Sequence, residues 1–81
     1  MIVNVLLFAA AKEIAGSQQL EVSIDEPCTV GRLKAALVSE CPGLAALTAR
    51  SAFSVDQAYA SNETEIGPDA EVAMIPPVSG G

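Results

Sequence analysis

The chain ends in two glycines, and its terminal carboxylate is the group in the sequence that is best suited to chemistry. Two prolines precede this end and stiffen the chain into an extended form. Glycine has no side chain, so a Gly-Gly end can pass through a narrow channel with little steric obstruction. The tail therefore predicts a carboxylate that is presented to the active site of another protein. Threading is assigned to Pro76, Pro77, Val78, Ser79 and Gly80, and the reacting carboxylate to Gly81.

The side chains supply little chemistry of their own. The chain has no histidine, so the commonest general acid–base is missing and no Ser/His/Asp triad can form. Acidic neighbours such as Asp25 and Glu26 lie in an expected turn and are interpreted as solvated surface charge. No Gly-rich phosphate loop is present, because no helix follows Gly80-Gly81. We therefore expect no enzyme activity from this chain alone and no cofactor bound by it.

Two cysteines, Cys28 and Cys41, are the only thiols. They form no CxxC pair and have no histidine partner, so we expect no metal site. Two thiolates are also too few for the four ligands of an iron–sulfur cluster. We interpret both as free structural thiols in a reducing compartment, with a disulfide or a reactive thiol as the alternative.

Length and charge limit the possible partners. The 81 residues suit one domain, and 51% of them are hydrophobic. Ten acidic residues against four basic ones give a net charge of −6, which disfavours nucleic acid. An acidic surface suits a basic patch on a protein partner, although the same charge also serves solubility alone. No apolar run is long enough to cross a membrane, and we expect no signal peptide and a cytoplasmic location.

Two strands are expected near the N-terminus, at residues 2–8 and 19–24, because both segments alternate in hydrophobicity. In the first, Val3, Val5 and Leu7 share the inner face, whereas Asn4, Leu6 and Phe8 share the face nearer solvent. In the second, Leu20, Val22 and Ile24 face inward. A short helix at residues 9–15, ended by Gly16, is expected to join the two strands.

The main helix is expected to begin after Thr29, a plausible N-cap. Hydrophobic residues then recur at helical spacing and form one apolar stripe. Pro42-Gly43 ends this helix, and residues 44–50 add a shorter helical turn. The stripe consists of Val30, Leu33, Leu37 and Cys41.

The last third of the chain predicts three further strands. Residues 52–56 and 57–60 are expected to pair, and residues 71–75 form the final strand, closed by Pro76-Pro77. On that strand Val72 and Met74 face inward, and Glu71, Ala73 and Ile75 are expected on the exposed face. The order of elements predicts an α+β fold of the ubiquitin-like β-grasp type, with one main helix on one face of a mixed sheet. The expected division is a β-grasp domain at residues 1–76 and an extended tail at residues 77–81.

The tail and three other segments resemble the small subunits of molybdopterin synthase, a family of ubiquitin-like sulfur carriers. The most specific match is the C-terminal stretch, and the similarity in layout spans the full length. The matching residues are Glu71-Val72-Ala73, Pro76-Pro77-Val78-Ser79-Gly80-Gly81, Phe8-Ala9, Lys12-Glu13, Gly16 and Val55-Asp56-Gln57. The chain departs from the family at Met74-Ile75, where an aromatic pair is common.

The resemblance implies a mechanism and two partners. An E1-like activating enzyme would use ATP to adenylate Gly81, and sulfur would then replace the adenylate to leave a thiocarboxylate. The large subunit of the synthase would take the tail, supply the catalytic side chains and pass the sulfur to the cyclic pyranopterin precursor. The family also implies a heterotetramer of two small and two large subunits, without nucleic acid or membrane.

The resemblance further implies that Phe8, Tyr59 and Ile75 form an apolar patch that docks both partners. Strand alternation independently places Phe8 and Ile75 on exposed faces, and exposed apolar clusters commonly mark interfaces. The alternative is that one or more of the three closes the core.

Three other functions compete with this interpretation. A sulfur carrier for thiamine thiazole synthesis would use the same terminal chemistry, but the Pro76-Pro77-Val78 approach favours the molybdopterin branch. A ubiquitin-like modifier would form isopeptide bonds to lysines and appear as conjugates of higher mass. A plain β-grasp interaction module would keep working without Gly81.

Overall fold

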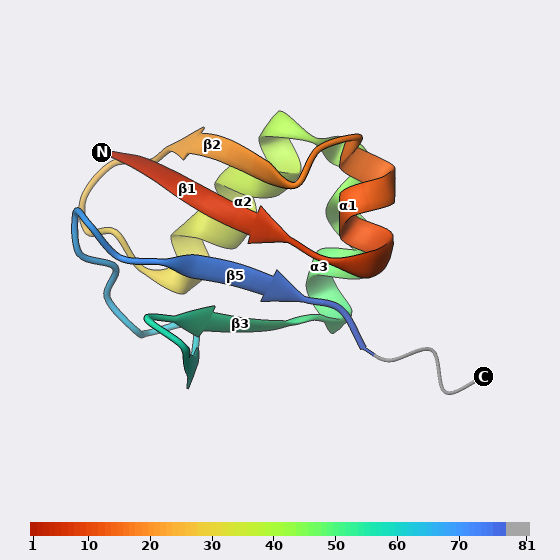
Figure 1. Cartoon of the computed structure of the whole chain (residues 1–81). Helices are drawn as coiled ribbons and strands as arrows, with labels where there is room; N and C mark the ends of the chain where they lie inside the picture. Colours follow the sequence, from red (N-terminus) through yellow and green to blue (C-terminus); the bar gives the residue numbers. More distant parts are fainter. Residues whose placement is uncertain (78–81) are drawn as a thin grey trace.

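Five strands form one mixed sheet in the order β2-β1-β5-β3-β4 (Figure 1). The computed structural model describes residues 1–77 of the chain. At the centre, β1 runs parallel to β5, and every other neighbouring pair is antiparallel. The strands are β1 (Ile2–Leu7), β2 (Gln19–Ser23), β3 (Ala52–Val55), β4 (Ala58–Ala60) and β5 (Val72–Ile75). The predicted α+β β-grasp class with a mixed sheet is confirmed.

The main helix α2 covers one face of the sheet and lies behind the strands in Figure 1. This helix begins after Thr29, whose side-chain Oγ1 accepts a hydrogen bond from the Arg32 backbone N–H at 3.3 Å, as predicted for an N-cap. Short helices α1 and α3 flank it at one end of the sheet. The helices are α1 (Ala9–Ala15), α2 (Val30–Glu40), the 3-10 turn η1 (Pro42–Leu44) and α3 (Ala45–Arg50).

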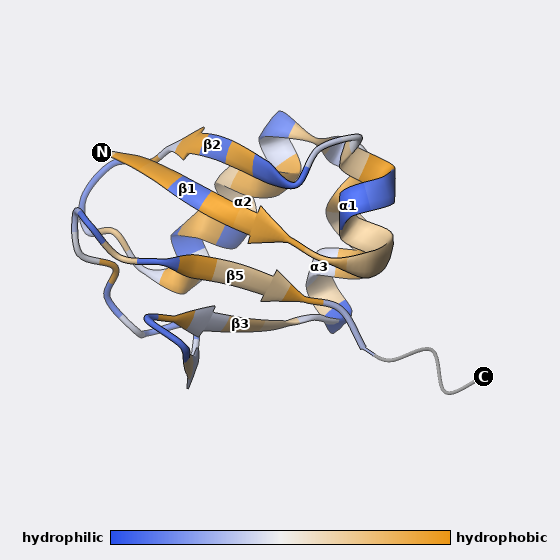
Figure 2. Cartoon of the chain, in the orientation of Figure 1, coloured by the Kyte–Doolittle hydropathy of each residue, from blue (hydrophilic) through white to orange (hydrophobic). Residues whose placement is uncertain are grey.

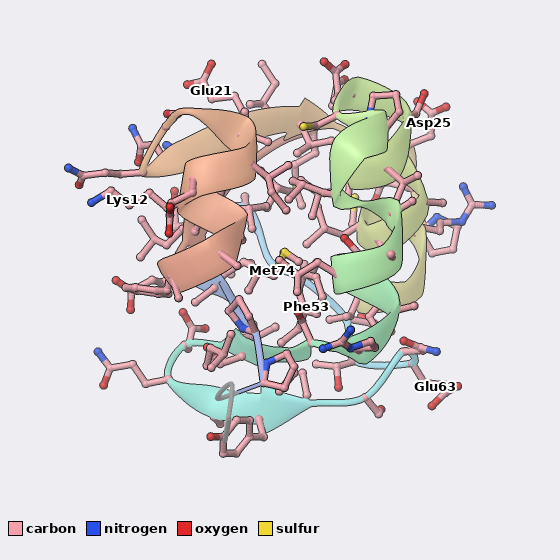
Figure 3. All side chains as sticks on the ribbon, turned by 90° about the vertical axis from the view of Figure 1, so that its right-hand side faces the viewer. Lys12, Glu21, Asp25, Phe53, Glu63 and Met74 are labelled. Atoms are coloured by element: carbon pink, nitrogen blue, oxygen red, sulfur yellow. The ribbon has the colours of Figure 1, made fainter. Side chains whose placement is uncertain are left out.

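The core lies between α2 and the sheet and is built from aliphatic side chains with one aromatic ring. Alternation along β1 is confirmed, because Val3, Val5 and Leu7 are all buried. Met74 and Phe53 point into the interior of the domain (Figure 3). Along β2, orange and blue residues alternate in Figure 2, which shows the period-two pattern of a strand with one buried face.

The prediction for the exposed face of β5 is wrong at one position. Ala73 was expected to be exposed, but only 8% of its surface is accessible. It sits on the central strand, opposite Leu6 of β1 and Ser54 of β3. Because its side chain is a single methyl group, the larger side chains on both neighbouring strands shield it from solvent. Ala73 therefore forms the floor of a groove, whereas Ile75 on the same face is half-buried.

The turn between β3 and β4 holds the start of β5. Asp56 and Gln57 both have positive φ values, 51° and 70°, as in the two-residue turns that match the twist of a hairpin. The Asp56 backbone N–H donates to the Glu71 carbonyl at 2.7 Å. In return, Asp56 Oδ1 accepts from the Glu71 backbone N–H at 2.9 Å. These reciprocal bonds fix the register of β5 against β3.

Replacing Asp56 with Ala is expected to lower the free energy of unfolding by about 1–2 kcal/mol. The variant loses the acceptor for the Glu71 N–H and places a residue without a local polar side chain in the left-handed region. Asp56→Asn is the matched control, since Asn keeps an Oδ1 acceptor and tolerates positive φ. Urea unfolding of both variants checks this, and equal loss in the two would refute the role of the acceptor.

The structure also describes both cysteines and the segment that precedes α2. Cys28 is buried, Cys41 is half-buried, and neither takes part in a disulfide. Within residues 1–77, no helix has the length and apolar character needed to span a membrane. Glu26-Pro27 and the neighbouring residues form the expected turn before Thr29.

Candidate functional site

The face of the sheet opposite the helices contains a groove of about 400 Å³. Its floor is Ala73, and its walls come from β1, β3, β4 and β5. Apolar side chains dominate one end, whereas Gln57 and Glu71 form a polar edge at the other. The residues that line it are Leu6, Phe8, Ser54, Gln57, Tyr59, Glu71, Ala73 and Ile75. We call this set the docking groove.

The structure brings together the three residues that were predicted to dock partners. Phe8, Tyr59 and Ile75 all line the docking groove. Tyr59 is 80% exposed and Phe8 is 49% exposed, so neither closes the core. Ile75 is half-buried and lines the groove. Exposed apolar side chains that share one hollow are typical of a protein-binding surface.

Local structure explains why each of the three side chains points into the groove. Phe8 follows β1 as the N-cap residue of α1, and Ala9 after it turns the chain with a φ of 50°. Tyr59 lies on edge strand β4 opposite Ser54, where the Asp56–Gln57 turn places it. Ile75 ends β5 opposite Ala52. The ends of β1 and β5 and the middle of β4 therefore contribute side chains to one surface.

The docking groove also contains residues that the sequence reasoning did not assign to a site. Leu6 shares the Phe8 face of β1, and the alternation of that strand was sufficient to find it. No pattern along a single strand identifies the other three, because their place in the groove depends on which strands lie side by side. These residues are Ser54, Gln57 and Glu71. The Gln57 amide donates to a Glu71 carboxylate oxygen at 3.5 Å, which links the two polar edge residues.

The C-terminal tail leaves the sheet beside this groove. Because β5 runs parallel to β1, the two strands end at the same edge, and Ile75 and Phe8 lie there together. Pro76 is half-buried and Pro77 is exposed, and the tail departs at this corner (Figure 1). The remaining predicted tail residues, Val78, Ser79, Gly80 and Gly81, lie outside the described part of the chain.

The lining of the docking groove has the character of a protein-binding surface. Among the described residues that line the docking groove, none is Lys or Arg, and the one carboxylate is that of Glu71. Across residues 1–77, no three His, Cys, Asp or Glu side chains gather closely enough to hold a metal ion. Apolar walls with a polar edge match the anatomy of protein interfaces. The surface is suited to hold a partner against the exit of the tail.

Comparison with protein families gives one match that covers almost the whole chain. The ThiS family matches residues 5–81. The molybdopterin synthase sulfur carrier subunit of Homo sapiens is 33% identical over 82 residues, which cover 98% of this chain and 93% of the human protein. The subunit of the same name from Arabidopsis thaliana is 29% identical and covers 98% of this chain and 82% of the plant protein.

Solved structures agree with this relationship. SAMP1, the small archaeal modifier protein 1 of Haloferax volcanii, superposes with a TM-score of 0.88 at 29% identity, with full coverage of both chains. A complex of subunits 1 and 2 of molybdopterin-converting factor from Helicobacter pylori shares the fold at a TM-score of 0.71 and 22% identity, again over both whole chains. On the family match and the human relative, this chain belongs to the ThiS family and to the family of molybdopterin synthase sulfur carrier subunits.

Proposed function

We propose that this protein carries sulfur on its C-terminal carboxylate and is the small subunit of a molybdopterin synthase. One observation carries the proposal: an exposed apolar groove lies directly beside the exit of a tail that ends in Gly-Gly. The groove would hold the body of the protein on a partner while the tail enters the partner's active site. The names of the human and Arabidopsis relatives support the pathway.

The chemistry that we propose takes place at the carbonyl carbon of Gly81. Its carboxylate attacks the α-phosphorus of ATP, pyrophosphate leaves, and an acyl-adenylate forms. A sulfide-equivalent nucleophile then attacks the carbonyl carbon and expels AMP, which leaves a thiocarboxylate. A carboxylate is a poor electrophile, and adenylation converts it into one with a good leaving group. Because the chain has no histidine, the acid–base groups would come from its partners.

Two partners follow from this scheme. An E1-like activating enzyme would bind the docking groove during adenylation, and the large synthase subunit would bind it during sulfur transfer. In that transfer the thiocarboxylate sulfur bonds to the cyclic pyranopterin precursor, and water then hydrolyses the thioester link, which leaves sulfur on the precursor and regenerates the Gly81 carboxylate. A subunit complex has been solved for the Helicobacter pylori relative. We propose a heterotetramer of two small and two large subunits acting in the cytoplasm, where ATP is available.

Reconstitution tests this function. The chain is loaded with sulfur by its activating enzyme and ATP, then mixed with the large subunit and the cyclic precursor. Formation of the dithiolene product in proportion to loaded chain supports the proposal. Loading without any product would point to another sulfur pathway, such as thiazole synthesis. Absence of loading with an active activating enzyme would remove the carrier role.

Covalent protein modification is the second candidate, and the similarity to the small archaeal modifier protein 1 favours it. The same activated carboxylate would then form an amide with a lysine of another protein. An epitope-tagged chain produced in its own cells distinguishes the two functions. Conjugates that resist thiols and disappear when Gly81 is deleted would establish modification, whereas a pure sulfur carrier gives none.

A further inference from the structure

A second hollow, of about 530 Å³, lies at the base of the tail on the helical side of the sheet edge. It is formed by the start of α1, the end of α3 and the two prolines, and Figure 3 views the molecule from this end. The hollow shares Phe8 and Ile75 with the docking groove, so these two side chains form a ridge between the two depressions. Its other main walls are Leu47, Arg50, Pro76 and Pro77. We call it the tail-base hollow.

The charges around the tail exit differ on the two sides of the ridge. Glu71 is the charged residue of the docking groove. The tail-base hollow contains Arg50 and Glu13, and among residues 1–77 Arg50 is the one Lys or Arg that lines either depression. Arg50 is exposed in the last turn of α3, where a cation is favourable for the helix. A partner that covers both sides would therefore meet only a carboxylate, Glu71, on one side, but a guanidinium together with a carboxylate, Arg50 and Glu13, on the other.

The length of the tail requires such a partner to cover both sides. Four residues follow Pro77, and fully extended they span about 14 Å. The active site that takes Gly81 must consequently open within about this distance of Pro77. A protein channel that encloses the tail has walls all around it, so its mouth rests on surfaces on both sides of the ridge.

We propose that the tail-base hollow is a second docking contact for the large synthase subunit, and that Arg50 pairs there with a carboxylate of that subunit. The assignment rests on the proposed function. In this arrangement the docking groove supplies most of the affinity for the partner. Arg50 fixes the orientation in which the partner docks. Complementary charges at an interface edge steer association and select the docked orientation.

Charge reversal at Arg50 tests the assignment, and the chain offers a matched control at Arg32. Both side chains are exposed and both reversals change the net charge equally, so any effect of the overall field cancels between them. Arg32 lies on α2, in a separate hollow with Ser23 and Asp25. Glu at position 32 is three residues after N-cap Thr29, a position that favours Glu in a helix.

The measurement is binding of each sulfur-loaded chain to the large subunit from the same organism, as Kd and association rate at low and high salt. We expect Arg50→Glu to weaken binding at least tenfold, mainly through the association rate, and Arg32→Glu to stay within twofold. The tenfold difference should shrink at high salt. Arg50→Gln should weaken binding about threefold, which keeps the test valid if the Glu variant folds poorly.

Equal binding by the Arg50 and Arg32 variants would overturn the assignment while leaving the sulfur-carrier function intact. Tighter binding of Arg50→Glu would also overturn it, since the partner would then present a cation at this place. Failure of the unchanged chain to bind the large subunit would overturn the proposed function itself, and the assignment with it. The three outcomes separate failure of the inference from failure of the function.

Discussion

Deletion of Gly81 is expected to abolish sulfur loading completely while the domain stays folded. The last described strand, β5, ends at Ile75, six residues before Gly81, so we expect the domain to fold without the final residue. The chemistry, in contrast, depends on where the terminal carboxylate lies. Removing one residue shortens the tail by about 3.5 Å. A misplacement of this size is enough to prevent a reaction that requires the reacting atoms to be aligned.

A bulky residue at the end of the tail is expected to have nearly the same effect. Gly81→Val and Gly80→Val add side chains that a narrow channel must exclude, so loading should fall at least a hundredfold. Gly67→Val is the matched control, because a Cβ at Gly67 meets no atom within 4 Å and its backbone needs no positive φ. Circular dichroism measures whether each variant is folded, and mass spectrometry measures the fraction of each variant that is loaded with sulfur. Normal loading of the Gly80 or Gly81 variant would refute the channel.

Replacing Phe8 with Asp is expected to weaken binding of both partners by about 30- to 100-fold. Central aromatic side chains at interfaces are commonly worth 2 kcal/mol or more, which corresponds to this factor. The fold should survive, since half of the Phe8 ring is already exposed. Phe8 is also the N-cap residue of α1 and makes no side-chain cap bond, and Asp is favourable at an N-cap.

The control for Phe8→Asp is Ile14→Asp. Ile14 has the same exposed fraction, 49%, and lies on α1 outside the docking groove. The Ile14→Asp variant introduces the same charge at a position of comparable accessibility. It therefore measures how much any added carboxylate on this surface weakens binding or stability. Isothermal titration with each partner and thermal unfolding of the free chain provide the two readouts. Unfolding of the Phe8 variant, or equal weakening by Ile14→Asp, would show that the docking groove is misplaced.

The elements of this fold were predictable where one periodic pattern dominated. Alternation over the first strand identified its buried face, and the stripe from Val30 to Leu37 identified the helix that covers the sheet. Both patterns arise because each element buries one face only. The start of α2 was predictable from Thr29, because few residue types can accept a hydrogen bond from the free backbone N–H groups in the first turn of a helix.

The remaining features depend on contacts between segments that are far apart in the sequence. Ala73 was expected to be exposed, because its own strand alternates, but burial there is decided by Leu6 and Ser54 on neighbouring strands. The positive φ values at Asp56 and Gln57 were missed, since Gln is an unusual residue for such a turn. The parallel pairing of β1 with β5, which brings the tail beside Phe8, likewise has no local signal.

Intact-mass spectrometry of the chain isolated from cells that contain its activating enzyme tests the central claim most directly. We expect a species in which one oxygen is replaced by sulfur, with the change localised to the peptide that carries Gly81. The same species should be absent when the activating enzyme is inactive. A chain of unmodified mass only, with an active enzyme and a sulfur source present, would contradict the sulfur-carrier function.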